Sequence, residues 1–349
     1  MSVAINGTNG ITYNDGSLQP SAPVGKNRII NGNMMIDQRN SGGVTTPGNN
    51  GYTLDRWNAG LSQSSKYSVQ QVVDAPSGFY NSIKATVLAT VSLGATDYFM
   101  LKHKIEGYNV ADLNFGTANP ETITLSFWVK SSVTGTFGGG IQNSNESRGN
   151  AFNYTISSAN TWEYKSVTLT GDTTGTWDKT NGTGLWLNLA LGVGTTYSKS
   201  TGSWGAGPVL SATGATNLLA TSSATIQFTG VQLETGTTAT PFEHLQYGQQ
   251  LALCQRYYEQ NYGTNNYEVK IQGITSGLTN SAFKVSKRAD ATTTVYSSVT
   301  QTAGTVNNGN GNVQTAISSV ISGKESFWVS MAGTSSQVYT YYFKSSAEL

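Results

Sequence analysis

The stretch that decides the fold is Ile226-Gln-Phe-Thr-Gly-Val-Gln-Leu-Glu-Thr-Gly-Thr-Thr-Ala-Thr-Pro-Phe-Glu-His244. Ile226 and Phe228 alternate with polar residues, as in a strand that buries one face. After Gly230 the alternation resumes in Val231 and Leu233 but is shifted by one residue, which would place this second pair on the wrong face. A β-bulge at Gly230, where no Cβ obstructs the kink, lets both pairs point into one core. We therefore predict that this stretch is the closing strand of a large β domain.

Short strand-like segments separated by Gly, Ser, Thr and Asn fill residues 50–244 before this closing strand. The segment 123–130 is the clearest, because apolar residues alternate with Thr124, Ser126, Trp128 and Lys130. The segment 185–193 repeats the pattern, with Trp186 opposite its leucines. Further strands are predicted at 52–57, 67–73, 83–91 and 98–105. About eight or more short strands without long helices predict an all-β, antiparallel jelly-roll sandwich.

Composition agrees with an all-β fold and excludes several classes of function. The 349 residues include 40 Gly, 18 Tyr, 11 Phe and 7 Trp, and the length suggests two domains plus a tail. Charged residues make up 11% and the net charge is +1, so no basic field is available to recruit nucleic acid. Cys254 is the only cysteine, so no intrachain disulfide can form.

The N-terminal residues lack a charged region followed by an apolar one, so we expect no signal peptide. No apolar run has the length needed to span a membrane, and we expect no membrane insertion. The protein is therefore expected to be made in a cytoplasm and to reach the outside by another route, such as cell lysis.

Five segments carry a resemblance to a known class of protein. The run Lys26-Asn-Arg-Ile-Ile-Asn-Gly-Asn-Met-Met-Ile-Asp-Gln-Arg-Asn40 resembles a signature near the N-terminus of many bacteriophage tail-fibre and related virion proteins. The run Ile11–Gln19 resembles their attachment segment, and Val231–Gly236, Ala239–Glu243 and Cys254–Tyr258 are also similar to this class. The resemblance implies a virion location, a jelly roll like that of carbohydrate-binding modules, and attachment to other virion proteins through the N-terminal segment.

The predicted organisation has five parts. Residues 1–25 form the attachment segment and linker, 26–49 an arm, 50–244 the jelly roll, 245–263 a connecting helix and 264–349 a small β domain. The helix stripe consists of Tyr247, Leu251, Cys254 and Tyr258 at helical spacing. This stripe fits either the axis of a homotrimer or packing against the jelly roll. Cys254 on it is interpreted as a small buried hydrophobe.

No catalytic or structural metal motif stands out, so we expect the protein not to be an enzyme. One cysteine and two histidines cannot build an ordinary zinc site. His103 is expected on a solvated strand face, and His244 in packing beside Phe242. Gly138–Gly140 is interpreted as a flexible loop. The resemblance to carbohydrate-binding modules implies a structural calcium ion, and the Gly171–Gly175 loop offers oxygen ligands for it.

Tryptophans are the candidate glycan-binding residues. Trp128 and Trp186 lie on the faces of their strands opposite the apolar stripes, where an indole can stack on a sugar ring or fill a subunit interface. Trp57 and Trp177 lie near predicted turns and are candidates for the same contact from loops.

Three functions are compatible with these patterns. The first is a trimeric tail fibre or tail-tip protein that mediates host adsorption by binding a cell-surface glycan. The second is a structural virion protein, such as a head decoration, head fibre or baseplate component, that uses the jelly roll for assembly. The third is a polysaccharide depolymerase.

Overall fold

The computed structural model describes residues 4–6, 10–12, 18–19, 25–261, 269–272, 277–308, 313–331 and 338–349. Side chains are described for residues 25–261, 279–308, 314–331 and 338–349. Much of the predicted attachment segment 1–25 therefore lies outside the described residues. Its described strands are β1 (Ala4–Asn6), β2 (Gly10–Thr12) and β3 (Leu18–Gln19), and in the described part of the chain they pair only with one another.

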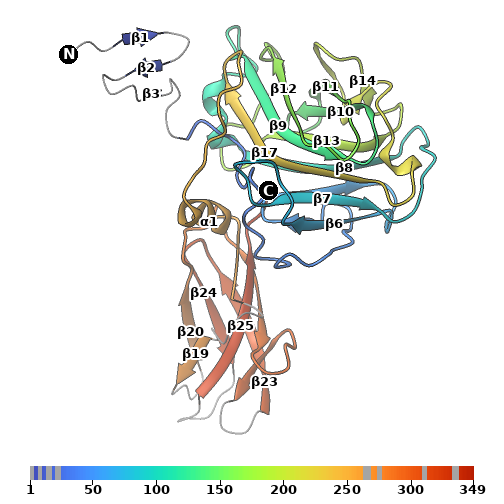
Figure 1. The fold of residues 1–349 in the computed structure, drawn as a ribbon. Coiled ribbons are helices and arrows are strands. Elements are labelled where there is room, and N and C mark those ends of the chain that lie inside the picture. Colours follow the sequence, from blue (N-terminus) through green and yellow to red (C-terminus); the bar gives the residue numbers. More distant parts are fainter. Residues whose placement is uncertain are drawn as a thin grey trace.

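Two antiparallel sheets face each other and form a jelly-roll-like sandwich, which confirms the predicted fold class (Figure 1). The seven-stranded sheet has the order β15 (Trp204–Ala206), β11 (Arg148–Ile156), β10 (Gly135–Gln142), β13 (Thr183–Val193), β8 (Tyr98–Glu106), β5 (Trp57–Leu61) and β4 (Tyr52–Leu54). The five-stranded sheet has the order β12 (Glu163–Leu169), β9 (Ile123–Ser131), β17 (Thr225–Thr235), β7 (Ser82–Val87) and β6 (Tyr67–Val72). Smaller elements are the parallel pair β14 (Ser198–Lys199) and β16 (Ser211–Ala212), and the 3-10 turns Gly107–Asn109, Ala111–Leu113 and Leu218–Ala220.

The core between the sheets follows from the alternation in the sequence. Leu125 and Phe127 of β9 point inward from one sheet, and Leu187 and Leu189 of β13 point inward from the other; all four are fully buried. Burying one such side chain contributes about 1.5–3 kcal/mol. The same alternation turns Trp128 and Trp186 away from the core.

The bulge predicted at Gly230 is present. The register between β17 and β9 shifts between Thr229 and Gln232, and Gly230 has a φ of 60°. Because the shift restores the inward direction, Phe228 before it and Val231 after it are both fully buried in the same core.

The sequence predicts a flexible loop at Gly138–Gly140. This prediction is wrong, because these residues are part of strand β10. A Cβ atom on Gly140 would lie 2.2 Å from the backbone oxygen of Val209, and one on Gly138 would lie 2.3 Å from Ser211 Oγ. The segment around β16 crosses the outer face of the sheet so closely that no side chain fits between them. Glycine is therefore needed at these positions.

The connecting helix is shorter than predicted. Helix α1 spans Tyr247–Gln255, and Tyr258 instead begins strand β18 (Tyr258–Gln260), which pairs with β25 (Val338–Ser346). Cys254 is fully buried against Ile30 and Ile36 of the arm, in agreement with its interpretation as a small hydrophobe. No helix in the described ranges is long and apolar enough to cross a membrane.

The smaller C-terminal domain contains strands on both sides of an aromatic core (Figure 1). Besides β18 and β25, its strands are β19 (Val269–Gln272), β20 (Gly277–Ala282), β21 (Thr292–Ser297), β22 (Thr305–Asn308), β23 (Val313–Ser322) and β24 (Ser326–Met331). Phe327, Phe343 and Tyr341 pack together in this core, with Phe327 and Phe343 ring centroids 4.9 Å apart.

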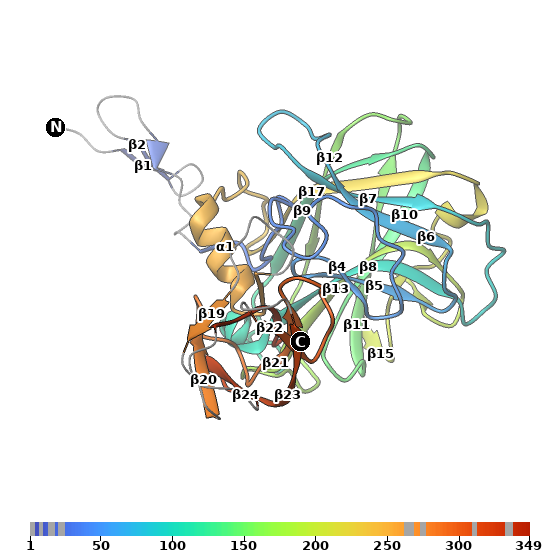
Figure 2. The same cartoon turned by 90° about the horizontal axis from the view of Figure 1, so that it is seen from below.

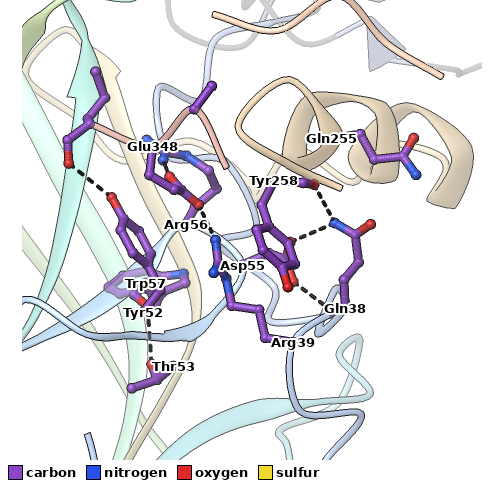
Figure 3. A network of polar contacts seen from close by, with 12 residues as sticks. Gln38, Arg39, Tyr52, Thr53, Asp55, Arg56, Trp57, Gln255, Tyr258 and Glu348 are labelled. Atoms are coloured by element: carbon purple, nitrogen blue, oxygen red, sulfur yellow. Dashed lines mark hydrogen bonds and ion pairs between the residues drawn. The ribbon is translucent and has the colours of Figure 1, made fainter. Parts of the chain in front are cut away.

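Residues after β25 return to the sandwich and join the two domains (Figure 3). Glu348 forms ion pairs with the buried guanidinium of Arg56 and with Arg39, the latter at 2.6 Å. Gln38 donates from Nε2 to Asp55 Oδ1 at 2.7 Å, and burial raises the pKa of Asp55 to about 6. Because these charges are buried and partnered, this joint is a structural element rather than a ligand site.

Candidate functional site

Two of the four candidate tryptophans are buried and are not available to a glycan, so those two assignments are wrong. Trp57 is fully buried, and its indole N–H donates to the Asn31 backbone oxygen at 3.1 Å. Trp177 is 9% exposed and packs edge-on against Phe115 and Trp204, with centroid distances of 4.9 and 5.3 Å. Both side chains belong to the core of the sandwich, Trp57 as the first residue of strand β5, and proximity to a turn does not indicate this.

Trp128 lies in an open cleft on the outer face of the five-stranded sheet. Tyr164 is directly opposite it on β12, and their ring centroids are 5.4 Å apart. Across the cleft Phe79, Phe242 and His244 pack together, with centroid distances between 4.9 and 5.2 Å. We call this the aromatic cleft; it is defined by these five side chains.

The aromatic cleft has the size and lining of a ligand site. Its volume is about 470 Å³, within the usual range of small-molecule pockets. Gly230 lines it, and a Cβ atom there would lie 2.6 Å from Phe79. The bulge glycine therefore serves both the core and the cleft. Ser77, Ser126 and Thr240 add hydroxyls beside the aromatic rings.

The wall of the cleft formed by 239–244 is fixed by buried hydrogen bonds. Glu234, almost fully buried, accepts from the backbone N–H and the hydroxyl of Thr240 at 2.9 and 2.6 Å. Gln232 donates to Glu234 at 2.8 Å and accepts from the Glu243 backbone N–H at 2.9 Å. Because the wall is held in one geometry, a ligand does not have to order it on binding.

Trp186 lies in a smaller and more polar site on the outer face of the seven-stranded sheet. The ammonium groups of Lys102 and Lys104 lie 5.4 and 4.9 Å from the centroid of its ring. The adjoining cavity has a volume of about 190 Å³. We call it the lysine pocket; it is lined by Asn49, Asn50, Tyr98, Met100, Lys102, Glu146, Trp186, Tyr197, Pro208 and Leu210.

The helix stripe does not face one surface. Cys254 and Tyr258 are buried within the chain, and Leu251 packs on the cluster around Cys254. Tyr247 is 56% exposed, so it points away from that cluster. The prediction that all four residues share one helical face is wrong, because α1 ends before Tyr258.

Sequence analysis did not identify two residues of the aromatic cleft, Tyr164 and Phe79. Tyr164 lies directly opposite Trp128 on β12. Exposed and less exposed residues alternate along this strand, so the outward direction of Tyr164 could have been predicted from the sequence pattern. Phe79 lies in a loop, and nothing in the sequence indicates that it meets Phe242 and His244. Packing of His244 against Phe242 is confirmed at 4.9 Å.

His103 was expected on a solvated face but is fully buried, because it points inward between two outward lysines. Its Nε2 lies 3.0 Å from the Ile30 backbone oxygen, and its ring meets the edge of Trp57 at 5.1 Å. Burial lowers the pKa of His103 to about 3, so the ring stays neutral at ordinary pH.

The loop considered for calcium does not fit a cation. Both carboxylate oxygens of Asp172 accept from Arg148, at 2.8 and 2.7 Å, so they face a guanidinium. Across the described ranges, no group of three or more His, Cys, Asp and Glu side chains is placed to hold a metal ion.

No family model and no curated protein matches the sequence. Matching solved structures include the enzymatically active domain of tailspike protein 4 of bacteriophage CBA120, with a TM-score of 0.29 and 13% identity over 54% of this chain and 21% of that one. They include a CBM4 structure, with a TM-score of 0.30 and 15% identity over 60% of this chain and 99% of that one. They also include a protein of Bacteroides thetaiotaomicron described as sugar-binding, with a TM-score of 0.33 and 11% identity over 60% of this chain and 100% of that one.

Proposed function

We propose that the chain is a tail-fibre or tail-tip protein of a bacteriophage, located in the virion, that mediates host adsorption by binding a cell-surface glycan in the aromatic cleft. The observation that carries the proposal is the construction of this cleft. Trp128 and Tyr164 form one side, and the segment 239–244 forms the other. That second side includes Ala239–Glu243, one of the segments that resemble phage virion proteins.

The chemistry of the cleft suits a sugar with an apolar ring face. The indole of Trp128 and the ring of Tyr164 offer flat surfaces for the C–H groups of a pyranose. The exposed Ser77 lines the cleft and offers its hydroxyl to a hydroxyl of the same ring. None of the described residues that line the cleft is Asp or Glu. Glycoside hydrolysis ordinarily needs two carboxylates, so the proposed role of the cleft is binding without cleavage.

Two other segments that carry the resemblance, 26–40 and 231–236, meet at the base of the same wall. Asn27 accepts from the Leu233 backbone N–H at 3.1 Å and donates to the Val231 backbone oxygen at 3.2 Å. Its own backbone N–H donates to Glu243 at 2.9 Å. The arm, the closing strand and the wall thus form one hydrogen-bonded unit, which supports reading these segments as a single module.

The proposal extends to assembly. We infer a homotrimer that attaches to other virion proteins through the N-terminal segment. Tyr247 and Leu253 of α1 are 56% and 37% exposed, which leaves apolar surface for contact between copies. Sedimentation equilibrium of the purified chain measures the number of copies directly.

Glycan binding is tested by screening the purified protein against immobilised, defined neutral oligosaccharides and then titrating the best ligand. We expect Trp128→Ala to weaken this binding at least tenfold, because the indole surface that stacks on the sugar ring is lost from one side of the cleft. Trp328→Ala is the matched control, since Trp328 is 40% exposed but lies in the C-terminal domain. Equal affinity of the wild type and Trp128→Ala would contradict the proposal.

A structural virion protein is the second candidate, because aromatic side chains such as Phe79 and Phe242 are also enriched at protein interfaces. In that case the wild type binds no oligosaccharide, and Trp128→Ala impairs incorporation of the chain into particles. Release of reducing sugar from host polysaccharide would instead favour a depolymerase.

A further inference from the structure

The lysine pocket has features that the aromatic cleft lacks, and it lies on the other sheet of the sandwich. Strands β13, β8, β5 and β4 lie side by side in the seven-stranded sheet (Figure 2). On their outer face Lys102 pairs in register with Asn58 on one side and Asn188 on the other. Directly opposed residues share a face of the sheet, so the ammonium-bearing side chain stands between two amides.

These two amides are buried and have no hydrogen-bond partner. Asn58 is 1% exposed and Asn188 is fully buried, and neither their oxygen nor their nitrogen atoms are paired. The indole N–H of Trp186 is buried and unpaired as well. Buried polar groups in folded proteins are nearly always satisfied. The unpaired indole N–H of Trp186, which lines the pocket, therefore marks a place where a polar ligand or ordered water completes the site, and the two unpaired amides flank Lys102 in register.

Lys102 has a charge that is not neutralised within the described part of the chain. Its Nζ donates to Asn50 Oδ1 at 2.5 Å, and no described carboxylate lies within ion-pair distance of it. Lys104 is already used, because its Nζ donates to the Leu349 backbone oxygen at 2.8 Å. Glu146 also lines the pocket and is the charge that opposes an anion there. Burial, and then Lys104, lower the pKa of Lys102 to about 8.

We propose that the lysine pocket is a second binding site, in which Lys102 binds the carboxylate of an acidic monosaccharide unit. The walls support this class of ligand. Tyr98 and Tyr197 meet edge to face at 5.8 Å and flank the pocket together with Trp186, so ring surfaces are available beside the cation. Asn49 and Asn50 provide amides for sugar hydroxyls.

The size and charge of the pocket narrow the ligand further. A volume of about 190 Å³ suits one sugar unit and not an extended oligosaccharide. A single ammonium matches the single charge of a carboxylate, whereas phosphate groups are typically bound by several donors or by a bidentate guanidinium. This site neither shares residues with the aromatic cleft nor depends on glycan binding there.

The test is calorimetric titration of the full chain with glucuronate, glucose and inorganic phosphate at pH 7 and constant ionic strength. We expect glucuronate to bind at least tenfold more tightly than glucose or phosphate. Lys102→Met keeps the length of the side chain and should weaken glucuronate binding at least tenfold. Glu146→Gln should strengthen it, because the opposing charge is removed. Lys84→Met is the matched control on β7 of the other sheet and should bind like the wild type.

Three results would overturn the proposal. One is equal binding of glucuronate and glucose, and another is glucuronate affinity that changes in neither Lys102→Met nor Glu146→Gln while both variants remain folded by circular dichroism. Tighter binding of phosphate than glucuronate would also overturn it and identify a general anion site. Trp128→Ala should leave glucuronate binding unchanged, so failure of the cleft and failure of this site are separable.

Discussion

The outer faces of the two sheets carry one tryptophan each, yet they present different chemistry. Trp128 stands opposite Tyr164 and faces Phe79 and Phe242, so its surroundings are aromatic and uncharged. Trp186 stands beside Lys102 and Lys104, and its own indole N–H is buried and unpaired. Both tryptophans point outward for the same reason, the period of two along a strand. The difference arises because other segments cover each face.

This comparison separates orientation from environment. Strand alternation decides which side chains leave the core, but the loop containing Phe79 and the segment 239–244 create the cleft. On the other sheet, the segment around Val209 crosses β10 and narrows the space beside Trp186. A similar strand pattern therefore yields one site suited to a neutral ring and one suited to an acidic ring.

The largest expected effect comes from closing the aromatic cleft at Gly230. Gly230→Val should destabilise the fold by about 3 kcal/mol, because a branched residue at φ 60° is strained and its Cβ would overlap Phe79. Neutral oligosaccharide binding should be lost, while glucuronate binding in the lysine pocket persists. Chemical denaturation and calorimetry measure the two effects.

Gly202→Val is the control for Gly230→Val, since Gly202 also has a positive φ, of 94°, but its Cβ would meet no atom within 4 Å. We expect backbone strain alone there, with both binding activities intact. Equal destabilisation of the two variants with an intact cleft would show that Gly230 is needed for its φ and not for the space it leaves.

The next effect concerns His103, which points into the core between the outward Lys102 and Lys104. Its folded pKa, about 3, lies below the ordinary value of 6.5, so the unfolded chain binds a proton first as pH falls. Stability from the neutral ring is therefore present above pH 6.5 and is progressively lost as pH falls toward 3. Between pH 7 and pH 5 this loss amounts to about 2 kcal/mol.

His103→Gln removes this titration, so the wild type should lose about 2 kcal/mol more unfolding free energy than the variant between those pH values. Urea denaturation of both proteins at pH 7 and pH 5 measures the difference. Burial raises the pKa of Asp55 to about 6, so its contribution to stability changes with pH in the opposite direction. This contribution is the same in both proteins and cancels when their unfolding free energies are subtracted. Parallel pH profiles for the two proteins would show that folding does not shift the pKa of His103.

The smallest expected effect separates the two sites by pH. Because the pKa of Lys102 is about 8, its charge is present at pH 7 and largely absent at pH 9. Glucuronate affinity should fall about tenfold across this range. Lys104, Glu146, Tyr98 and Tyr197 also face the pocket, so the profile of Lys102→Met serves as the baseline. A wild-type profile that matches this baseline would remove Lys102 from the site.

Much of the fold was predictable from local pattern. The alternation in 123–130 and 185–193 predicted the central strands of both sheets, and these are β9 and β13. The slipped alternation around Gly230 predicted a bulge, because only an inserted residue allows both apolar pairs to face one core. The end of α1 was not predictable in this way, since Tyr257 and Tyr258 fit a helical period but are needed in packing and in β18.

The candidate sites were predictable only in part, and for a physical reason. The sequence by itself determined an all-β sandwich and the outward direction of Trp128 and Trp186, because strand geometry is local. It did not determine that Trp57 and Trp177 are buried, or that Phe79 and His244 meet. The contact between Phe79 and His244 joins segments more than a hundred residues apart, and Trp57 and Trp177 are buried by partners outside their own strand or loop. Only the tertiary structure decides which distant side chains share a surface, and so what each tryptophan can bind.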